Sequence, residues 1–309
     1  MPATLVAAGL LAVALTATPL TRAGSSAAVT TTTVVAAGDI ACRPPVNLAL
    51  HSCSQQRTAN LVESLQPAAV LMLGDSQYQS ATAAEYNAPG AYVQTWGRPS
   101  ILQRTIPVAG NHEWLTPGAA GYRSVFDGRT GGRFYHSRDL SNGWHVIGLD
   151  SDCDEVGGCT STSAQGRWLA ADLAANDRKP TIVMWHHPRW SSGEHGDNAA
   201  TGPLWLATVS DPDVQIVLNG HDHDYERLHR TGRYGAVTST GARTFIVGTG
   251  GAGLRAAPSG ARDVHSAFFG SSAHGVLRLT LRPDGYDWRF VAARGTLDDS
   301  GTSPLRPRT

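Results

Sequence analysis

The sequence contains five short apolar runs, and each of them ends in a side chain that can bind a metal ion. The runs are Val34–Asp39, Val70–Asp75, Ile106–His112, Ile182–His186 and Ile216–His223. A short apolar run that stops at a polar residue is typical of a buried strand. Because ligands bind beyond the carboxyl ends of strands in open α/β sheets, the five run ends can meet. The pattern therefore predicts an α/β fold with one site built from distant segments.

The other predicted elements fit a single α/β domain. Apolar residues recur at helical spacing in Gln55–Leu65, Ala164–Ala175 and Pro203–Val209. Further strands are expected over Phe134–Leu140, Trp144–Leu149, Thr244–Val247, Val276–Leu281 and Tyr286–Val291. Strands that alternate with helices early and dominate late favour two packed β-sheets with helices outside. We expect one domain over residues 32–295, with a Gly-rich loop over 114–132 and a disordered tail over 296–309.

The first 28 residues resemble a secretory signal peptide. Leu5–Leu20 is apolar, and small residues follow it at two possible cleavage sites, residues 21–23 and 26–28. The apolar stretch is shorter than the roughly 20 residues that cross a bilayer, so a retained anchor is less favoured. The stretch lacks the basic residue that usually precedes it, which leaves a low-complexity tail as the alternative. The expectation is a secreted or periplasmic protein.

The cysteines form two local pairs, Cys42 with Cys53 and Cys153 with Cys159. Neither pair has the C-x-x-C spacing of a zinc or redox motif. In an exported protein we expect two disulfides, each worth about 2–3 kcal/mol in the chain-entropy model. If the chain stays in the cytosol, four thiols are the alternative.

The balance of charges in the sequence gives no support to partners that bind through a strongly charged surface. The 25 basic and 25 acidic residues balance, and no basic run occurs. Nothing in this pattern favours a nucleic-acid or membrane partner, so we expect a small-molecule substrate. The sequence leaves the oligomeric state open.

The donors at the run ends are oxygen and imidazole, without thiolate, which suits Mn, Fe or Zn rather than a structural zinc finger. Two metal ions that lie close together share a ligand, and Asp75 is the natural bridge. The other candidate ligands are Asp39, Asn111, His186, His221 and His223. His221 and His223 are spaced by two, so both rings point the same way if the segment is a strand. Taken singly, each residue also fits a turn, a cap or a loop.

Five motifs in this order resemble those of calcineurin-like metallophosphoesterases. They are Gly38-Asp39, Gly74-Asp75-Ser76-Gln77-Tyr78, Gly110-Asn111-His112-Glu113, Trp185-His186-His187-Pro188 and Gly220-His221-Asp222-His223. Tyr78 and the sequence Tyr225-Glu226-Arg227 resemble the purple acid phosphatase branch. The second position after Asp39 is Ala41, where most of the superfamily has histidine and this branch does not. The resemblance implies a four-layer αββα sandwich made of two mixed sheets.

The resemblance also implies two metal ions and their ligands. It assigns the first ion to Asp39, Asp75, Tyr78 and His223, and the second to Asp75, Asn111, His186 and His221. A phenolate ligand implies Fe(III) in the first position, with Zn, Mn or Fe(II) in the second.

By this resemblance the chain hydrolyses phosphate monoesters through attack of a metal-bound hydroxide. His112 is expected to protonate the leaving oxygen, and Glu113 either orients His112 or caps the following loop. His195 resembles a phosphate-contacting histidine of the family. One alternative is a phosphodiesterase or nucleotidase with the same metals. Another is a metal- or phosphate-binding protein without turnover.

A second glycine motif competes with this interpretation. Gly248–Gly253 follows a predicted strand and fits the dinucleotide-binding pattern G-x-G-x-x-G. That fold needs a helix at this point, but Pro258 and Gly260 follow within a few residues. We therefore expect a Gly-rich turn that passes close to the metal site.

Overall fold

The computed structural model describes residues 1–5, 30–46, 53–256 and 259–308. Most of the predicted signal peptide, including both possible cleavage sites, lies outside these ranges. Within them, no helix is long and apolar enough to span a membrane.

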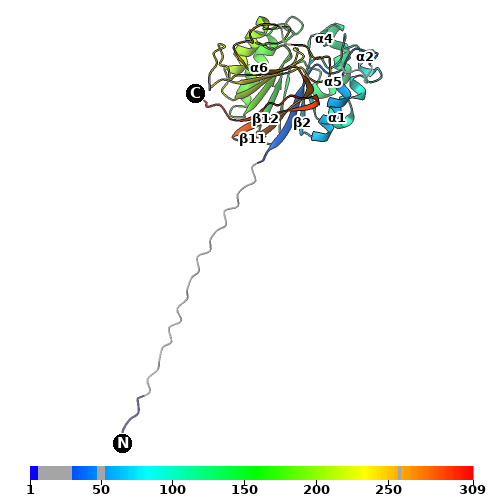
Figure 1. The fold of residues 1–309 in the computed structure, drawn as a ribbon. Helices are drawn as coiled ribbons and strands as arrows, with labels where there is room; N and C mark the ends of the chain where they lie inside the picture. The colour runs from blue at the N-terminus through cyan, green and yellow to red at the C-terminus, as the bar shows by residue number, and fades with distance from the viewer. Residues whose placement is uncertain (6–29, 47–52, 257–258, 309) are drawn as a thin grey trace.

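The first sheet has the strand order β13-β12-β11-β1-β2-β3 in the described part of the chain. Figure 1 labels β2, β11 and β12 among its strands. Its strands are β1 (Thr32–Ala37), β2 (Ala69–Leu73), β3 (Thr105–Val108), β11 (Ala273–Arg282), β12 (Gly285–Gly295) and β13 (Ser300–Pro304). β1, β2 and β3 run parallel, whereas β11, β12 and β13 pair antiparallel. The sheet is therefore mixed, and three of the predicted run ends leave it at the same edge.

The second sheet has the order β10-β8-β9-β7-β6-β5-β4 among the described residues. Its strands are β4 (His136–Asp139), β5 (His145–Gly148), β6 (Thr181–Met184), β7 (Val214–Asn219), β8 (Tyr225–Leu228), β9 (Arg243–Val247) and β10 (Ser266–Gly270). β5, β6, β7 and β9 are parallel, so His186 and Gly220 also follow strands at one common edge.

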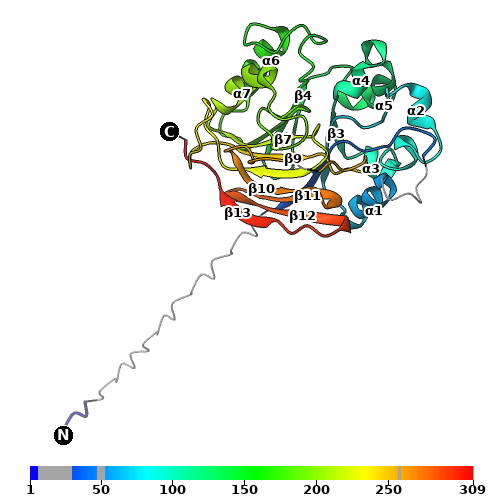
Figure 2. The same ribbon diagram turned by 45° about the horizontal axis from the view of Figure 1, so that its top comes forward.

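Helices cover the outer faces of both sheets (Figure 2). The longer ones are α1 (Gln55–Leu65), α5 (Ala120–Thr130), α6 (Ala164–Ala175) and α7 (Gly202–Val209). α1 packs on β11 and β12, and α5 packs on β3. α6 and α7 bury Leu169 and Trp205 in a cluster with Val183 of the second sheet. The short segments are α2 (Ala83–Asn87), η1 (Tyr92–Gln94), α3 (Pro99–Leu102), α4 (Asn111–Trp114), η2 (Pro117–Ala119) and η3 (Ala199–Thr201).

The main core lies between the two sheets. Ala36 and Leu71 of the first sheet share one buried cluster with Ile216 and Phe245 of the second. Burial of each such large side chain contributes about 1.5–3 kcal/mol. The predicted αββα sandwich is confirmed, with helices outside and apolar faces inside.

Two local predictions are wrong. The expected loop over residues 114–132 contains helix α5, which buries Tyr122 and Phe126 four positions apart. Gly121 weakens the helical pattern in the sequence, but the fold uses it, because a Cβ atom there would lie 1.8 Å from the carbonyl oxygen of Ala81.

The expected disordered tail contains β13, which pairs with β12 in register from Gly285–Pro304 to Arg289–Ser300. Its residues are mostly small and polar, so the pattern alone gives no strand signal. Pairing with β12 stabilises this strand, although its own residues have a low preference for strands.

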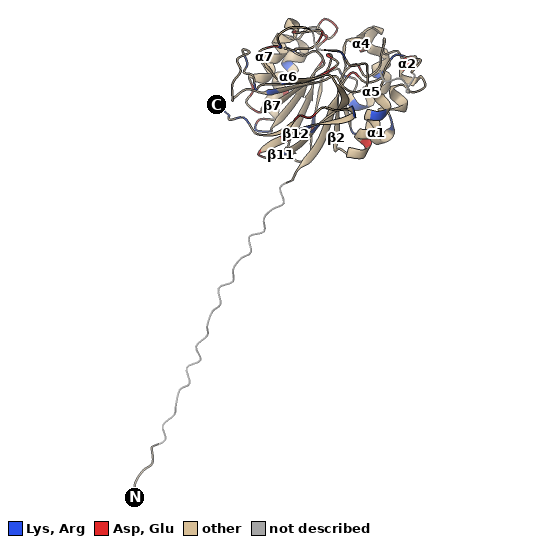
Figure 3. Cartoon of the chain, in the orientation of Figure 1, with Lys and Arg blue, Asp and Glu red and all other residues tan. Residues whose placement is uncertain are grey.

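Charged residues of both signs occur on several separate elements of the fold (Figure 3). This distribution agrees with the equal numbers of acidic and basic residues in the sequence.

Candidate metal centre

The carboxyl edges of the two sheets are joined by backbone hydrogen bonds. Gly38 N–H donates to Val247 O (2.9 Å), which links the end of β1 to the end of β9. His221 N–H donates to Asp39 Oδ2 (2.9 Å), so a side chain from the first sheet fixes a loop of the second. The structure thereby brings the predicted run ends from both sheets to one place.

Tyr78 lies at the centre of the first donor group. Its hydroxyl is 2.8 Å from Asp39 Oδ1, 3.0 Å from Asp75 Oδ2 and 2.9 Å from His223 Nε2. All four side chains are buried. These are the four residues that the family resemblance assigns to the first ion.

Without a cation, burial and the charge of Asp39 hold the pKa of the Tyr78 phenol well above its usual value. The protonated phenol donates to the carboxylates. A bound cation has to replace that proton, which favours a hard, highly charged ion.

The second donor group surrounds His186. Its Nδ1–H donates to Leu73 O (2.7 Å), which directs Nε2 toward Asp75 Oδ2 at 3.4 Å. Burial alone would raise the pKa of Asp75, but the neighbouring His186 holds it below its ordinary value.

Two atoms of this group have unused binding capacity. Asn111 Oδ1 and His186 Nε2 are buried and have no hydrogen-bond partner among the described residues. Buried polar atoms normally have a partner, so these two unpaired atoms fit a role as ligands of a cation. Separately, the donor atoms of Asp39, Asp75 and His186 lie within 4.8 Å of one another.

His221 and His223 do not lie on a strand, which corrects one expectation. His221 has a left-handed backbone, with φ of 74°, and the segment bends. Its ring centre is 5.1 Å from that of His186, whereas the His223 ring is 5.6 Å from Tyr78. The two imidazoles therefore face the two different donor groups.

Glycine and left-handed residues make this crowding possible. A Cβ atom on Gly74 would lie 2.5 Å from His186 Nδ1, and one on Gly110 would lie 2.4 Å from Asp75 Oδ1. Asp39 and Asp75 themselves have φ of 58° and 47°. Such strained backbone clusters at functional sites, where the surrounding structure holds it in place.

Comparison with known protein families shows to which family a chain with these residues belongs. The profile of the family described as "Calcineurin-like phosphoesterase" matches residues 32–225, which include all the candidate ligands. The chain belongs to the calcineurin-like phosphoesterase family.

Its relatives within this family include purple acid phosphatases. The chain is 30% identical over 139 residues to purple acid phosphatase 22 of Arabidopsis thaliana, covering 42% of this chain and 28% of that protein. It is 28% identical over 144 residues to tartrate-resistant acid phosphatase type 5 of Sus scrofa, covering 46% and 41%. The chain thus spans less than half the length of the curated relatives it matches.

The fold is similar to that of purple acid phosphatase PPD1 from yellow lupin, Lupinus luteus. The TM-score is 0.72 at 18% identity, over 89% of this chain and 54% of the lupin chain. GAP50, described as the anchor in the inner membrane complex of Plasmodium, has a TM-score of 0.62 at 15% identity, over 90% of each chain. The structural likeness supports the phosphoesterase fold.

His112 lies beside the metal-binding groups. Its Nδ1–H donates to Gln79 O (2.5 Å), and its Nε2 lies 3.8 Å from Asp75 Oδ2. The ring packs edge-on against Tyr78, with 4.4 Å between ring centres. Nδ1 is thus occupied, and Nε2 is the atom turned toward the centre.

Glu113 makes its contacts away from the His112 ring. Its carboxylate accepts N–H bonds from Asp75 (2.9 Å), Ser76 (2.8 Å) and Gly110 (2.7 Å), and O–H bonds from Ser76 and Tyr86. Burial and nearby Asp75 raise the pKa of Glu113 to about 7. Of the two expected roles, this geometry favours the structural one.

His195 joins the same centre. Its ring stacks on His221 with 4.2 Å between ring centres, and its N–H donates to Asp222 Oδ1 (2.8 Å). In the sequence, only the position of His195 in the loop after His186 suggests a role in the site. The structure places its ring against the candidate ligand His221.

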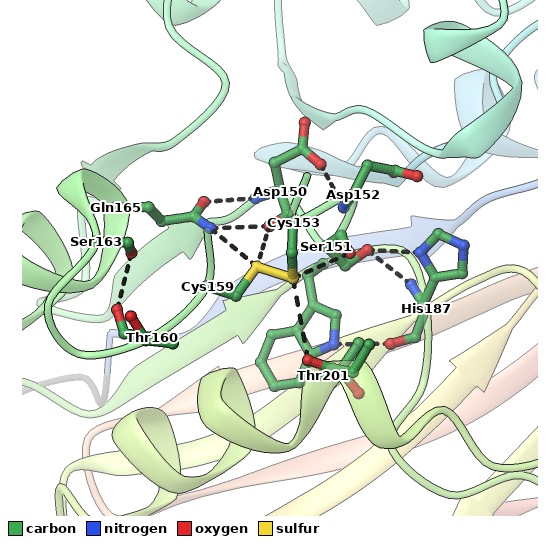
Figure 4. The surroundings of a disulfide bond; sticks show 12 residues. Asp150, Ser151, Asp152, Cys153, Cys159, Thr160, Ser163, Gln165, His187 and Thr201 are labelled. Atoms are coloured by element: carbon green, nitrogen blue, oxygen red, sulfur yellow. Dashed lines mark hydrogen bonds between the residues drawn. A yellow bond between two sulfur atoms is a disulfide. The ribbon is translucent and has the colours of Figure 1, made fainter. Parts of the chain in front are cut away.

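The sequence analysis missed His187. The donor atoms of His186, His187 and His221 lie within 4.8 Å of one another. Ser151 Oγ accepts the N–H of His187 (3.0 Å) and lies 2.9 Å from its Nδ1 (Figure 4). Burial, helped by the His186 charge, lowers the pKa of His187 to about 3. The sequence signal for His187 was its place directly after His186 in His186-His187-Pro188. Only His186 of this pair was predicted to be a ligand.

Asp150 and Asp152 were also missed. They follow β5 at the same edge, and Asp152 Oδ2 is buried without a hydrogen-bond partner among the described residues. Burial raises the pKa of Asp152 to about 6. The rule that found the other run ends also applies to Val146–Asp150, so this position was within reach of the sequence.

Both predicted disulfides, Cys42–Cys53 and Cys153–Cys159, are present. Cys153–Cys159 closes the loop directly after Asp152, next to the Ser151–His187 contact (Figure 4). The covalent link holds this loop beside the centre.

The Gly-rich segment 248–253 is a turn, as predicted. Gly250 N–H donates to Gly38 O (2.9 Å), and a Cβ atom on Gly248 would lie 2.9 Å from Asp39 Oδ2. Close backbone passage explains its glycines.

Proposed function

We propose that this protein is an exported phosphoesterase that uses two metal ions to hydrolyse phosphate monoesters. The observation that carries the proposal is the pair of buried donor groups that share Asp75. One group gathers at the Tyr78 hydroxyl and the other at His186 Nε2, and each contains oxygen and imidazole donors. A shared carboxylate between two such groups suits a pair of close cations.

The first cation would be held by Asp39, Asp75, Tyr78 and His223, and the second by Asp75, Asn111, His186 and His221. The phenol favours Fe(III) in the first position, and the neutral amide and imidazoles favour Zn, Mn or Fe(II) in the second. When bound, the pair supplies an activated water and neutralises charge on the phosphoryl oxygens.

The chain's own residues orient the substrate and move its proton. His112 would give the proton on Nε2 to the leaving oxygen, because Nδ1 is held by the carbonyl of Gln79. His195 would contact the phosphate from the other side of His221. Glu113 would keep the Asp75 loop in place throughout.

The experiment compares an alkyl phosphate with 4-nitrophenyl phosphate in the wild type and in His112→Asn. An alkoxide needs a proton to leave, whereas nitrophenolate hardly does. We expect kcat on the alkyl ester to fall about 100- to 10,000-fold and to fall much less on the aryl ester. The exposed His229→Asn serves as control. Equal losses on both esters would remove His112 from proton transfer, and an inactive wild type would contradict the proposed function itself.

Tyr78→Phe tests the metal in the first position. With Fe(III) there, the wild type should show a visible tyrosinate-to-iron absorption band that the variant lacks. A colourless wild type that contains iron would contradict the assignment of Tyr78 as a ligand.

Two alternatives keep the same site. A phosphodiesterase or nucleotidase would turn over a diester or a nucleotide faster than the matching monoester. The other alternative is a metal- or phosphate-binding protein without turnover, and the fold alone allows it, since GAP50, described as an anchor, has a similar fold. Tight binding of phosphate with no hydrolysis under any added metal would support that alternative.

Export is supported by the two disulfides, which persist mainly in oxidising compartments. Fractionation of cells that express the full chain tests it. We expect the protein outside the cytoplasm, and a cytoplasmic protein with four reduced thiols would contradict export.

A further inference from the structure

Arg255 leaves the Gly-rich turn at the rim of the metal centre. Its N–H donates to His223 O (3.1 Å), and two residues earlier Gly253 O accepts from His223 Nδ1 (2.7 Å). Ala252 N–H donates to Asp39 O (2.9 Å). The turn is therefore fastened to two candidate ligands, which fixes where the Arg255 side chain begins.

The Arg255 guanidinium contacts His195. Arg255 Nη1 donates to His195 Nε2 at 2.6 Å. A guanidinium has donors only, so His195 Nε2 is the acceptor in this contact. His195 in turn stacks on His221. The three side chains form a row that leads outward from the second donor group.

The charge of Arg255 is only partly used inside the protein. Its acidic neighbour is Glu194, at 3.5 Å, with side chains 31% exposed for Arg255 and 56% exposed for Glu194. Such an exposed ion pair contributes little to stability. A planar guanidinium still has donors to offer an oxyanion that approaches from solvent.

Metal ions held by the two donor groups would neutralise a phosphate bound to them, so the Arg255 guanidinium would be available to another anionic group. We propose that Arg255 is a specificity-determining residue that binds a second phosphate group of the substrate, next to the one that is hydrolysed. This rests on the proposed function. In pyrophosphate, the oxygen of a water molecule adds to one phosphorus and the water gives up a proton. The bridging P–O bond breaks, and the second phosphate leaves with the bridging oxygen and takes up that proton. Arg255 would hold that leaving phosphate.

The test compares inorganic pyrophosphate with phenyl phosphate. In Arg255→Gln we expect kcat/KM for pyrophosphate to fall about tenfold or more, the loss expected for a charge-assisted hydrogen bond. The value for phenyl phosphate should change less than about twofold. Arg255→Lys keeps the charge and should keep part of the preference. Glu194→Gln removes the competing carboxylate and should raise the preference for pyrophosphate.

Arg123→Gln, a surface arginine paired with Asp127 on α5, is the matched control and should leave both substrates unchanged. Equal losses on both substrates in Arg255→Gln would show that Arg255 acts only through His195 and would overturn the proposal. No change on either substrate would also overturn it. A wild type that hydrolyses phenyl phosphate in these experiments keeps the proposed function intact, whereas an inactive wild type rejects both.

Discussion

At the scale of single residues, Glu113 fixes the loop that carries Asp75. Its buried carboxylate accepts three backbone N–H groups, from Asp75, Ser76 and Gly110. An ionised or neutral carboxyl can accept these bonds, but an amide offers only one accepting oxygen. The shape of the candidate metal centre therefore depends on a residue that binds the backbone of the Asp75 loop.

Glu113→Gln should destabilise the protein by about 1–3 kcal/mol, because the amide N–H₂ would face backbone donors that stay unpaired. The measurement is urea unfolding followed by circular dichroism. Glu63→Gln is the control, since Glu63 lies on the surface of α1 and pairs with Arg98. An unchanged midpoint for Glu113→Gln would mean that these N–H groups find other partners.

Single residues also show where sequence reasoning stops. The ordered run ends identify six candidate ligands, because each follows an apolar strand, and the family resemblance adds Tyr78. His187 directly follows one of these run ends, whereas Arg255 carries no such signal, since its position beside His195 depends on loops that only the fold brings together. Exposed-loop arginines are too common for the sequence to single one out.

At the scale of elements, His145 ties three of them together. It lies on β5, and its ring contacts Asp139 of β4 (2.7 Å) and Asp172 of α6 (2.8 Å). Lys179 also pairs with Asp139. Burial lowers the pKa of His145, but the two carboxylates outweigh it and raise the pKa above its ordinary value.

The raised pKa means that the folded state holds this proton more tightly than the unfolded chain. The stabilisation is therefore fully present below the unfolded pKa of about 6.5 and is lost as pH rises through the folded value. His145→Gln should lower the free energy of unfolding by about 1–3 kcal/mol at pH 6 and by less at pH 9. Urea unfolding at both values checks this, and an equal loss at each would exclude a charged His145.

Asp299 joins the segment before β13 to the second sheet. Asp299 Oδ2 accepts from Tyr225 (2.8 Å), Arg227 (2.9 Å) and Trp288 (3.0 Å). Asp299→Ala would leave these donors buried and should cost about 3–5 kcal/mol. The adjacent, exposed Asp298→Ala should cost almost nothing. A similar melting temperature for both variants would contradict this role of Asp299.

Helices and strands of this fold differ in how well the sequence predicts them. α1 and α6 match their predicted bounds because apolar periodicity marks them. β13 and α5 were missed because their signals are long-range. β13 depends on pairing with β12, and the glycine in α5 reflects contact with Ala81. Elements defined by partners distant in sequence escape a reading of local patterns.

At the scale of the whole molecule, the metal centre lies where the two sheets meet. Asp39 and Asp75 follow strands of the first sheet, and His186 and His223 follow strands of the second. Bound cations would cross-link the sheets and neutralise two buried carboxylates. Removal of metal should therefore weaken the entire fold as well as the site.

A chelator should lower the melting temperature by several degrees. The free energy of unfolding should fall by about 3 kcal/mol if the metal was present at 100 times its Kd. Added Zn, Mn or Fe should restore it. Asp75→Ala serves as the control, because a variant that binds no metal pair should melt at the same temperature with and without chelator. A wild type that is insensitive to chelation would contradict metal-linked stability.

Elemental analysis of the purified protein tests the central claim most directly. The two donor groups predict about two transition-metal ions per chain in the wild type, and one or fewer in Asp75→Ala. A wild type that retains no metal after incubation with Fe, Zn and Mn, or an Asp75→Ala variant with the full wild-type content, would contradict the account.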